Sequence, residues 1–191
     1  MDLADTIRQR VRLVSGAGGQ KRYLIHPLNG RFHPIDYDAL EAVVQALAAR
    51  IPVAAIDFVV GFPEGGSVPA FAFGRAIGRP VVLGSRLPID EAGTISFEQS
   101  DAGLGTTHRV YGLAPGARVM ILEDELTNGA MTVNAVRAFR RAGVQIDHVA
   151  TLLAIDHETL WQRMAAENVT LHVGVRLPRD YAPRALDATT G

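Results

Sequence analysis

The chain has 191 residues, of which 48% are hydrophobic and 20% are charged, which suits one globular domain with a substantial core. Its formal net charge of −1 gives no electrostatic reason to expect binding to nucleic acid or to an anionic membrane. The sequence contains no cysteine, which excludes disulfides, thiolate catalysis and cysteine-bound metals.

The first 14 residues, MDLADTIRQRVRLV, lack the uninterrupted apolar run of a signal peptide. No apolar stretch approaches the roughly 20 residues needed to cross a bilayer. We therefore expect a soluble, cytoplasmic protein.

The first half of the chain alternates between helix and strand patterns. Residues 36–50 place apolar side chains on one helical face, with Asp36 or Asp38 as the N-cap and Pro52 just after the end. The apolar run at 56–62 predicts a buried strand, and a glycine-containing loop then leads into a helix. Residues 80–85 predict the next strand.

The pattern changes over residues 86–112, which show little periodicity. This is the longest segment without a clear element, and a long loop in a compact domain is usually functional or disordered.

The second half predicts strands at 118–124, 146–155 and 171–177, with helices at 128–142 and 157–168 between them. Strands that alternate with helices favour an α/β fold with a parallel sheet covered on both faces. Within a single domain of residues 1–191, we expect a core over about residues 36–177. Residues 1–35 and 178–191 do not fit the alternation and are expected to form an appendage, called the hood below.

Two adjacent acids, Glu123 and Asp124, follow the apolar run VMIL, and the turn TNGAM comes next. In a parallel sheet, ligands bind beyond the carboxyl ends of the strands. Backbone N–H groups of such a turn, with the dipole of the following helix, suit a phosphate. The acids repel phosphate, so they suggest a ligand that also offers hydroxyls or a divalent cation, such as a ribose 5-phosphate. The alternative, that the acids stabilise the helix N-terminus, fits less well because they precede it by several residues.

The stretch VMILEDELTNGAMT (119–132) resembles the phosphoribosyl-pyrophosphate (PRPP) signature of type I phosphoribosyltransferases. This resemblance implies that Glu123 and Asp124 contact the ribose hydroxyls. It also implies that the following loop binds the 5-phosphate through Thr127, Asn128, Gly129, Ala130 and Met131.

Two positions of this loop depart from the commonest family pattern. Many members have threonine where Asn128 stands and a hydroxyl residue where Met131 stands. Thr132 offers a hydroxyl one residue later. Because loop amides supply much of the binding, we expect weakened contacts rather than a lost site.

Residues 61–88 resemble the pyrophosphate-loop region of the same family, in which a short loop often holds an unusual cis peptide. The resemblance implies pyrophosphate contacts from Glu64, Gly65, Gly66 and Ser67, together with Arg86. Many relatives have a cation in this loop. An acid at Glu64 is unfavourable beside pyrophosphate unless it binds magnesium or turns away.

The irregular segment 86–112 then resembles the mobile loop that closes over PRPP and excludes water. In that reading His108 and Arg109 neutralise the departing pyrophosphate, and Glu98 or Asp101 contacts the acceptor. The alternative is that each of the four is an ordinary polar loop residue.

The other candidate ligands have simpler interpretations. His26, His148 and His172 are expected to be strand or edge residues. Trp161 lies on an amphipathic helix and is most simply a core residue, with an acceptor-base pocket as the alternative.

Together the resemblance implies a type I phosphoribosyltransferase fold of about five parallel strands. The implied reaction transfers the 5-phosphoribosyl group of PRPP to a nitrogenous base and releases pyrophosphate, with Asp124, Glu123 and Arg109 as catalytic residues. A purine-like acceptor, as in purine salvage, is the first choice, and orotate or a specialised heterocycle comes next. Mg²⁺, held mainly by PRPP, is the expected cofactor, and a homodimer the expected assembly. The alternatives are a non-catalytic PRPP- or nucleotide-binding regulatory protein and an enzyme that cleaves a nucleotide.

Overall fold

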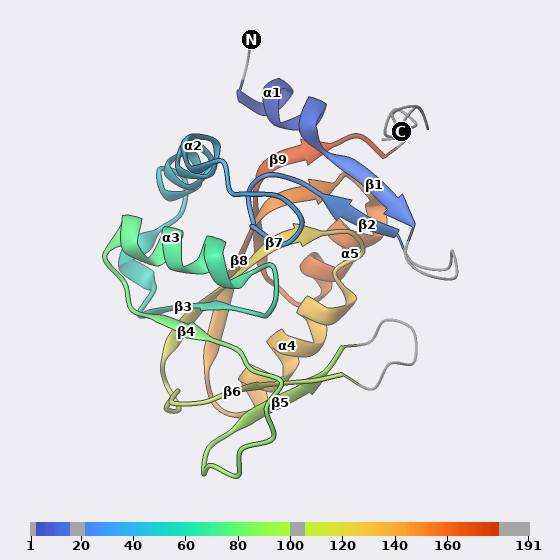
Figure 1. Cartoon of the computed structure of the whole chain (residues 1–191). Helices are drawn as coiled ribbons and strands as arrows, with labels where there is room; N and C mark the ends of the chain where they lie inside the picture. Colours follow the sequence, from blue (N-terminus) through green and yellow to red (C-terminus); the bar gives the residue numbers. More distant parts are fainter. Residues whose placement is uncertain (1–2, 16–21, 100–105, 180–191) are drawn as a thin grey trace.

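The computed structural model describes residues 3–15, 22–99 and 106–179. Within these residues, a parallel five-stranded sheet with the order β4-β3-β7-β8-β9 forms the centre of the molecule (Figure 1). Its strands are β3 (Phe58–Gly61), β4 (Val81–Leu83), β7 (Arg118–Leu126), β8 (Gln145–Ile155) and β9 (Thr170–Leu177). All five predicted strands are therefore confirmed.

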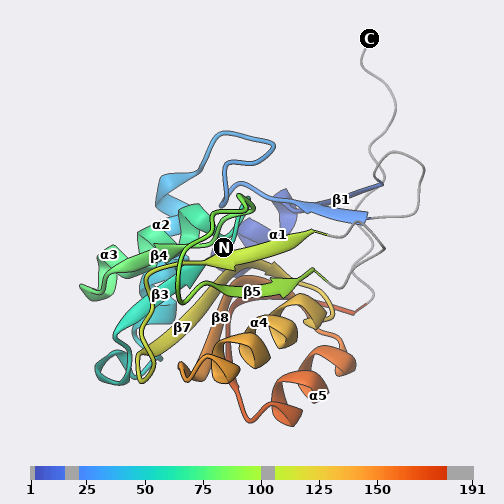
Figure 2. The same ribbon diagram turned by 90° about the horizontal axis from the view of Figure 1, so that it is seen from below.

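Helices cover both faces of the sheet, as the alternation predicts. Helices α2 (Tyr37–Ala48) and α3 (Ser67–Ile77) lie on one face, and α4 (Ala130–Arg141) and α5 (Glu158–Ala166) lie on the other (Figure 2). The first face is extended by α1 (Leu3–Arg10), whose Ile7 is fully buried in the same cluster as α2.

Within the central strand β7, the apolar residues Val119 to Leu122 are buried on both faces of the sheet. Successive side chains of a strand point to opposite faces. Val119 and Ile121 accordingly pack in the cluster with α4 and α5, and Met120 and Leu122 pack in the cluster with α2 and α3. The strand continues to Leu126, so the predicted end at residue 124 was too early, and both acids lie inside the strand.

The segment 86–112 contains two strands that its weak periodicity did not predict. Strands β5 (Ile95–Glu98) and β6 (Thr107–Val110) pair antiparallel beside α4 (Figure 2). Their inward residues Ile95, Phe97, His108 and Val110 are buried, whereas their neighbours Ser96 and Glu98 are exposed. Strands of four residues are too short to give a reliable alternation signal.

The N-terminal region supplies a second antiparallel pair, β1 (Arg12–Ser15) and β2 (Arg22–Ile25), outside the central sheet. A turn at residues 26–33 leads from β2 toward α2, which begins after the N-cap Asp36. The short helix η1 (Val53–Ala55) precedes β3. No helix in the described residues is long and apolar enough to cross a membrane.

Candidate functional site

The predicted ligand loops meet at the carboxyl ends of two neighbouring strands. Gly61 at the end of β3 pairs with Leu122 of β7, directly before the acids. The loop 62–66 follows β3, and residues 127–129 follow β7. The two loops that were predicted to bind pyrophosphate and 5-phosphate therefore leave adjacent strands at the same edge of the sheet.

Asp124 is the acid on which the contacts of this site converge. It is only 6% exposed, and Asn29 Nδ2 donates to its Oδ2 at 2.7 Å. The Nε2 atom of His26 lies 3.8 Å from the same oxygen. Burial alone raises the pKa of Asp124, but the adjacent His26, the hydrogen bond from Asn29 and the charge of Arg31 together outweigh burial and hold this pKa below its ordinary value.

His26 is therefore not the strand or edge residue that the sequence suggested. It follows β2, is 1% exposed, and its Nδ1 accepts from the N–H of Leu28 at 3.3 Å. Its Nε2 lies 3.1 Å from Asn29 Nδ2 and 3.8 Å from Asp124 Oδ2, so both hood residues meet at the same carboxylate. His148 and His172, in contrast, are residues of β8 and β9, as expected.

Glu123 has a different environment from its neighbour Asp124. It is 3% exposed, and its Oε1 has no hydrogen-bond partner among the described residues. Burial, together with the nearby charges of Asp124 and Glu125, raises the pKa of Glu123 well above its ordinary value. The environment thus favours the ionised form of Asp124 and the protonated form of Glu123.

Glu125 is a third acid of the site, and it was not predicted because the resemblance assigns roles only to its neighbours Glu123 and Asp124. Its Oε2 is buried without a hydrogen-bond partner among the described residues. Burial and the charge of Asp124 raise the pKa of Glu125 to about 8. Ligand atoms of His26, Asp124 and Glu125 lie within 4.8 Å of one another.

This cluster fits magnesium through its oxygens. Mg²⁺ prefers oxygen ligands, and it is commonly held by one or two carboxylates together with phosphate oxygens of a substrate. Asp124 and Glu125 supply such carboxylates, and the unpartnered Oε2 of Glu125 is available to a cation. His26 is the third member of the cluster, but its Nδ1 accepts from the backbone N–H of Leu28 and its Nε2 lies 3.1 Å from Asn29 Nδ2, so the two carboxylates suit Mg²⁺ better.

The predicted pyrophosphate loop lies against Asp124. A Cβ atom added to Gly65 would lie 1.8 Å from Asp124 Oδ2, so only glycine allows this approach. The Pro63–Glu64 peptide bond is cis, as the resemblance implied. The N–H of Gly66 donates to the carbonyl of Phe62 at 3.0 Å, and α3 begins at Ser67.

Glu64 of this loop faces two arginines. Its side chain is 64% exposed, and it lies 3.4 Å from Arg86 Nη1 and 3.8 Å from Arg31 Nε. Arg86 also reaches the carbonyl of Pro63 at 3.4 Å, and Arg109 donates to the carbonyl of Arg86 at 3.4 Å. The predicted pyrophosphate residues Glu64, Arg86 and Arg109 are thus linked by contacts.

Arg163 of α5 forms hydrogen bonds with the predicted phosphate loop. Gly129, with φ of 71°, precedes the first residue of α4, and Asn128 Oδ1 accepts from the N–H of Ala130 at 2.9 Å. Arg163 Nη1 donates to Asn128 Oδ1 at 2.9 Å and to its carbonyl at 2.8 Å. Asn128 Oδ1 therefore accepts two hydrogen bonds that fix the turn, a local role that asparagine fills more strongly than threonine.

The remaining residues of the phosphate loop differ in their exposure. Thr127 is exposed, whereas Met131 packs against the core. Thr132 is fully buried, and its Oγ1 has no partner among the described residues. In this conformation Thr127 is the hydroxyl residue that a ligand can reach.

The candidates on β5 and β6 separate into inward and outward residues. His108 is 1% exposed and stacks on Phe97 with ring centroids 5.3 Å apart. Burial and the charge of Arg86 lower its pKa, which disfavours the charged form that would neutralise pyrophosphate. Glu98 lies at the outer face and accepts from Thr107 at 2.6 Å. Asp101 lies outside the described residues.

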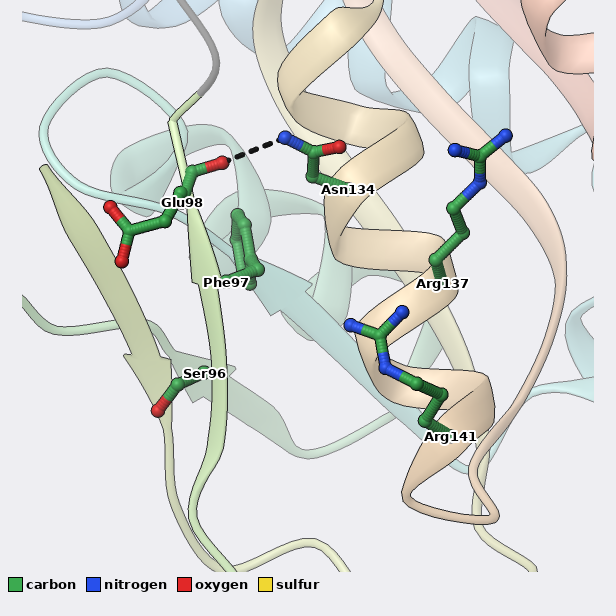
Figure 3. Close-up of a pocket in the computed structure, with 6 residues that line it drawn as sticks. All are labelled: Ser96, Phe97, Glu98, Asn134, Arg137 and Arg141. Atoms are coloured by element: carbon green, nitrogen blue, oxygen red, sulfur yellow. Dashed lines mark hydrogen bonds between the residues drawn. The ribbon is translucent and has the colours of Figure 1, made fainter. Parts of the chain in front are cut away.

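A pocket of about 410 Å³ between β5 and α4 is separate from these loops (Figure 3). Asn134 donates to the carbonyl of Glu98 at 2.9 Å across it, and the Glu98 carboxylate points away from α4. Arg137 and Arg141 project from α4, and Arg137 is paired with Glu167 at 2.7 Å. No loop residue of the predicted PRPP site lines it.

Trp161 has a structural environment of its own on α5. It packs partly buried against the core, and its Nε1 donates to Asp156 at 2.6 Å. The Arg176 guanidinium lies 4.4 Å from its ring centroid. The interpretation of Trp161 as a residue packed on the core fits these contacts.

The sequence of the chain is similar to those of known phosphoribosyltransferases. The chain is 31% identical over 125 residues to an adenine phosphoribosyltransferase of Roseiflexus sp., covering 61% of this chain and 69% of that protein. The chain belongs to the type I phosphoribosyltransferase family. It is also 30% identical over 142 residues to an orotate phosphoribosyltransferase of Sphingopyxis alaskensis, covering 73% of this chain but 61% of that protein. The chain thus spans about three fifths of the length of that orotate phosphoribosyltransferase.

Solved structures of the phosphoribosyltransferase family share the fold. The adenine phosphoribosyltransferase of Rhodothermus marinus superposes with a TM-score of 0.73 at 22% identity, covering 92% of this chain and 98% of that one. The enzyme of that name from Trypanosoma brucei gives a TM-score of 0.76 at 14% identity, covering 100% and 87%. No protein-family model matches the chain.

Proposed function

We propose that the chain transfers the 5-phosphoribosyl group of PRPP to a ring nitrogen of a purine-like base and releases pyrophosphate. The observation that supports this function best is the position of Asp124. It is a buried carboxylate whose hydrogen bonds favour its ionised form, and it touches the pyrophosphate loop three residues before the phosphate loop begins. A ribose with phosphates on both sides fits this juxtaposition.

In the proposed reaction, the bond from ribose C1 to the pyrophosphate oxygen breaks, and a bond from C1 to the base nitrogen forms. Pyrophosphate leaves with the electron pair of the broken bond, and the base nitrogen loses its proton to solvent. Asp124 accepts hydrogen bonds from the ribose hydroxyls and places negative charge beside the ring as positive charge develops on it. Backbone N–H groups at the start of α4 hold the 5-phosphate and orient C1.

Asp124 and Glu125 would hold Mg²⁺ together with oxygens of PRPP, and the ion would neutralise charge on the leaving pyrophosphate. A nearby divalent cation favours the ionised form of Glu125 despite its raised pKa. We further propose a homodimer in the cytoplasm, to be checked by size-exclusion chromatography with light scattering and by cell fractionation.

The test has two parts, binding and release. Titration calorimetry with PRPP and magnesium measures binding, and a pyrophosphate-release assay screens adenine, hypoxanthine, guanine and orotate. We expect PRPP to bind and one purine to trigger release. Release with orotate alone would correct the acceptor, and binding without release from any base would point to a regulatory protein.

A matched pair of variants tests the residue that carries the proposal. Asp124→Asn removes the charge while keeping the size of the side chain, so we expect a loss of PRPP binding or turnover with little change in the unfolding midpoint. Asp147→Asn removes the same charge at an exposed position of β8 and should behave as the unmodified chain. Near-normal use of PRPP by Asp124→Asn would refute the role of Asp124.

A further inference from the structure

The loop that is expected to hold pyrophosphate carries no cation of its own. Residues 62–66 read FPEGG, and their only charged residue is Glu64. Pyrophosphate carries several negative charges, and a site for it requires positive groups or amides nearby. The structure must therefore supply this charge from elsewhere.

The hood places an arginine at this loop. Arg31 follows Asn29 in the turn after β2, and its Nε lies 3.8 Å from Glu64 Oε2. Its backbone N–H donates to Asn29 Oδ1 at 3.0 Å, and its guanidinium lies 5.0 Å from the ring centroid of Phe32. Because Asn29 also donates to Asp124, it links the backbone of Arg31 to this acid, while the Arg31 side chain reaches the loop at Glu64.

The Arg31 side chain has unused hydrogen-bonding capacity. It is 23% exposed, yet its Nε atom is buried and has no hydrogen-bond partner among the described residues. A buried donor without a partner costs free energy, so it favours an acceptor that the chain itself does not supply. After burial and the other neighbours of these acids, the charge of Arg31 also lowers the pKa of Asp124 and of Glu125, so Arg31 acts on the same group of acids.

The contacts of Glu64 are weak enough to be exchanged. The distances to Arg31 and Arg86 are 3.8 and 3.4 Å, and the Glu64 side chain is 64% exposed. Exposed ion pairs contribute little, because water screens them and long side chains lose entropy. A phosphate group offers more charge and more acceptor oxygens to the same two arginines than one carboxylate does.

We propose that Arg31 of the hood is a pyrophosphate-binding residue, and that Glu64 holds Arg31 and Arg86 until pyrophosphate takes its place. This inference rests on the proposed function, because it names the cation of the same site. The ligand class is a pyrophosphate group, either free or attached to ribose. Glu64 then acts as an internal competitor that turns away when the ligand binds.

Titration calorimetry with two partial ligands separates the possibilities. Inorganic pyrophosphate with magnesium tests the pyrophosphate half of the site, and ribose 5-phosphate tests the other half. For Arg31→Gln we expect affinity for pyrophosphate to fall about tenfold to hundredfold, which corresponds to the loss of a charged hydrogen bond. Affinity for ribose 5-phosphate should change less than about twofold.

Three further variants complete the experiment. Arg31→Lys keeps the charge and should recover part of the pyrophosphate affinity. Glu64→Gln removes the competing charge and should tighten pyrophosphate binding about threefold or more. Arg75→Gln removes an exposed arginine at the far end of α3 and serves as the matched control, with affinities unchanged.

Each outcome decides the inference. Equal losses for both ligands in Arg31→Gln would indicate a structural role and overturn it, as would unchanged pyrophosphate affinity. Weaker pyrophosphate binding by Glu64→Gln would overturn the competitor role of Glu64. Should Arg31→Gln fail to fold, Arg31→Lys and Glu64→Gln still decide the question. If the unmodified chain binds neither ligand, the proposed function itself fails.

Discussion

Replacing Gly65 by alanine should disable the site through a single contact. The three atoms closest to a Cβ at this position all belong to Asp124, at 1.8, 2.3 and 2.7 Å. Real Cβ atoms essentially never approach closer than 3.0 Å, so the loop and the carboxylate must separate by about 1.2 Å. Asp124 cannot move freely by this amount, because Asn29 holds its Oδ2 at 2.7 Å.

The expected size of the effect follows from that displacement. A shift of about 1 Å in a reacting geometry costs roughly a hundredfold in rate, so kcat/KM for PRPP should fall by about that factor. Loss of the charged hydrogen bond from Asn29 should lower the free energy of unfolding by about 1.5–3 kcal/mol. Steady-state kinetics of pyrophosphate release and urea unfolding measure the two quantities.

A double-mutant cycle identifies the cause of the change. Asp124→Ala removes the side chain that the new Cβ meets, so adding Gly65→Ala to it should cost much less stability than adding it to the unmodified chain. Equal costs in both backgrounds would show that the Cβ meets something else. Unchanged kinetics of Gly65→Ala would refute the placement of Asp124 over the loop.

Three other changes test the polar network of the site. Glu125→Gln should flatten the pH dependence of stability: its pKa rises from 4.5 to about 8 on folding, so the folded chain binds a proton that the unfolded chain has lost. That difference lowers the free energy of unfolding by about 1.4 kcal/mol per pH unit between these values, which urea unfolding at several pH values measures. Asn29→Ala removes a hydrogen bond that lowers the pKa of Asp124, so the acid limb of the kcat/KM profile should move to higher pH. Arg163→Ala removes both bonds to Asn128 and should raise the KM for PRPP about tenfold, with the free energy of unfolding reduced by about 1–2 kcal/mol.

The sheet could be predicted because its signals are local and strong. Strands buried on both faces read as continuous apolar runs, and the helices between them carry one apolar face. The signature at 119–132 also predicted that the acids and the loop after them lie at the carboxyl edge of the sheet. A motif whose residues are adjacent in sequence needs no knowledge of long-range packing.

The hood contacts could not be predicted, because they join residues far apart in sequence. His26 and Asn29 reach Asp124 across almost one hundred residues, and nothing in the turn HPLNG specifies that partner. Arg31 was equally unrecognisable, since an arginine in a turn is usually a solvated surface residue. The burial of His108 was not predicted either. On a four-residue strand, the alternation of His108 and Val110 with their neighbours is too short to show which side chains face inward.

The three consecutive acids 123–125 show how the hood can act on the transfer reaction itself. Adjacent buried carboxylates repel one another, so their environments must differ if one of them is to remain ionised. The residues that favour the ionised form of Asp124 include His26, 3.8 Å away, and Asn29, which donates a hydrogen bond to it, and both belong to the hood. A substitution of His26 or Asn29 therefore changes the environment that keeps Asp124 ionised. The proposed binding of PRPP is thus expected to depend on the hood, through Asp124.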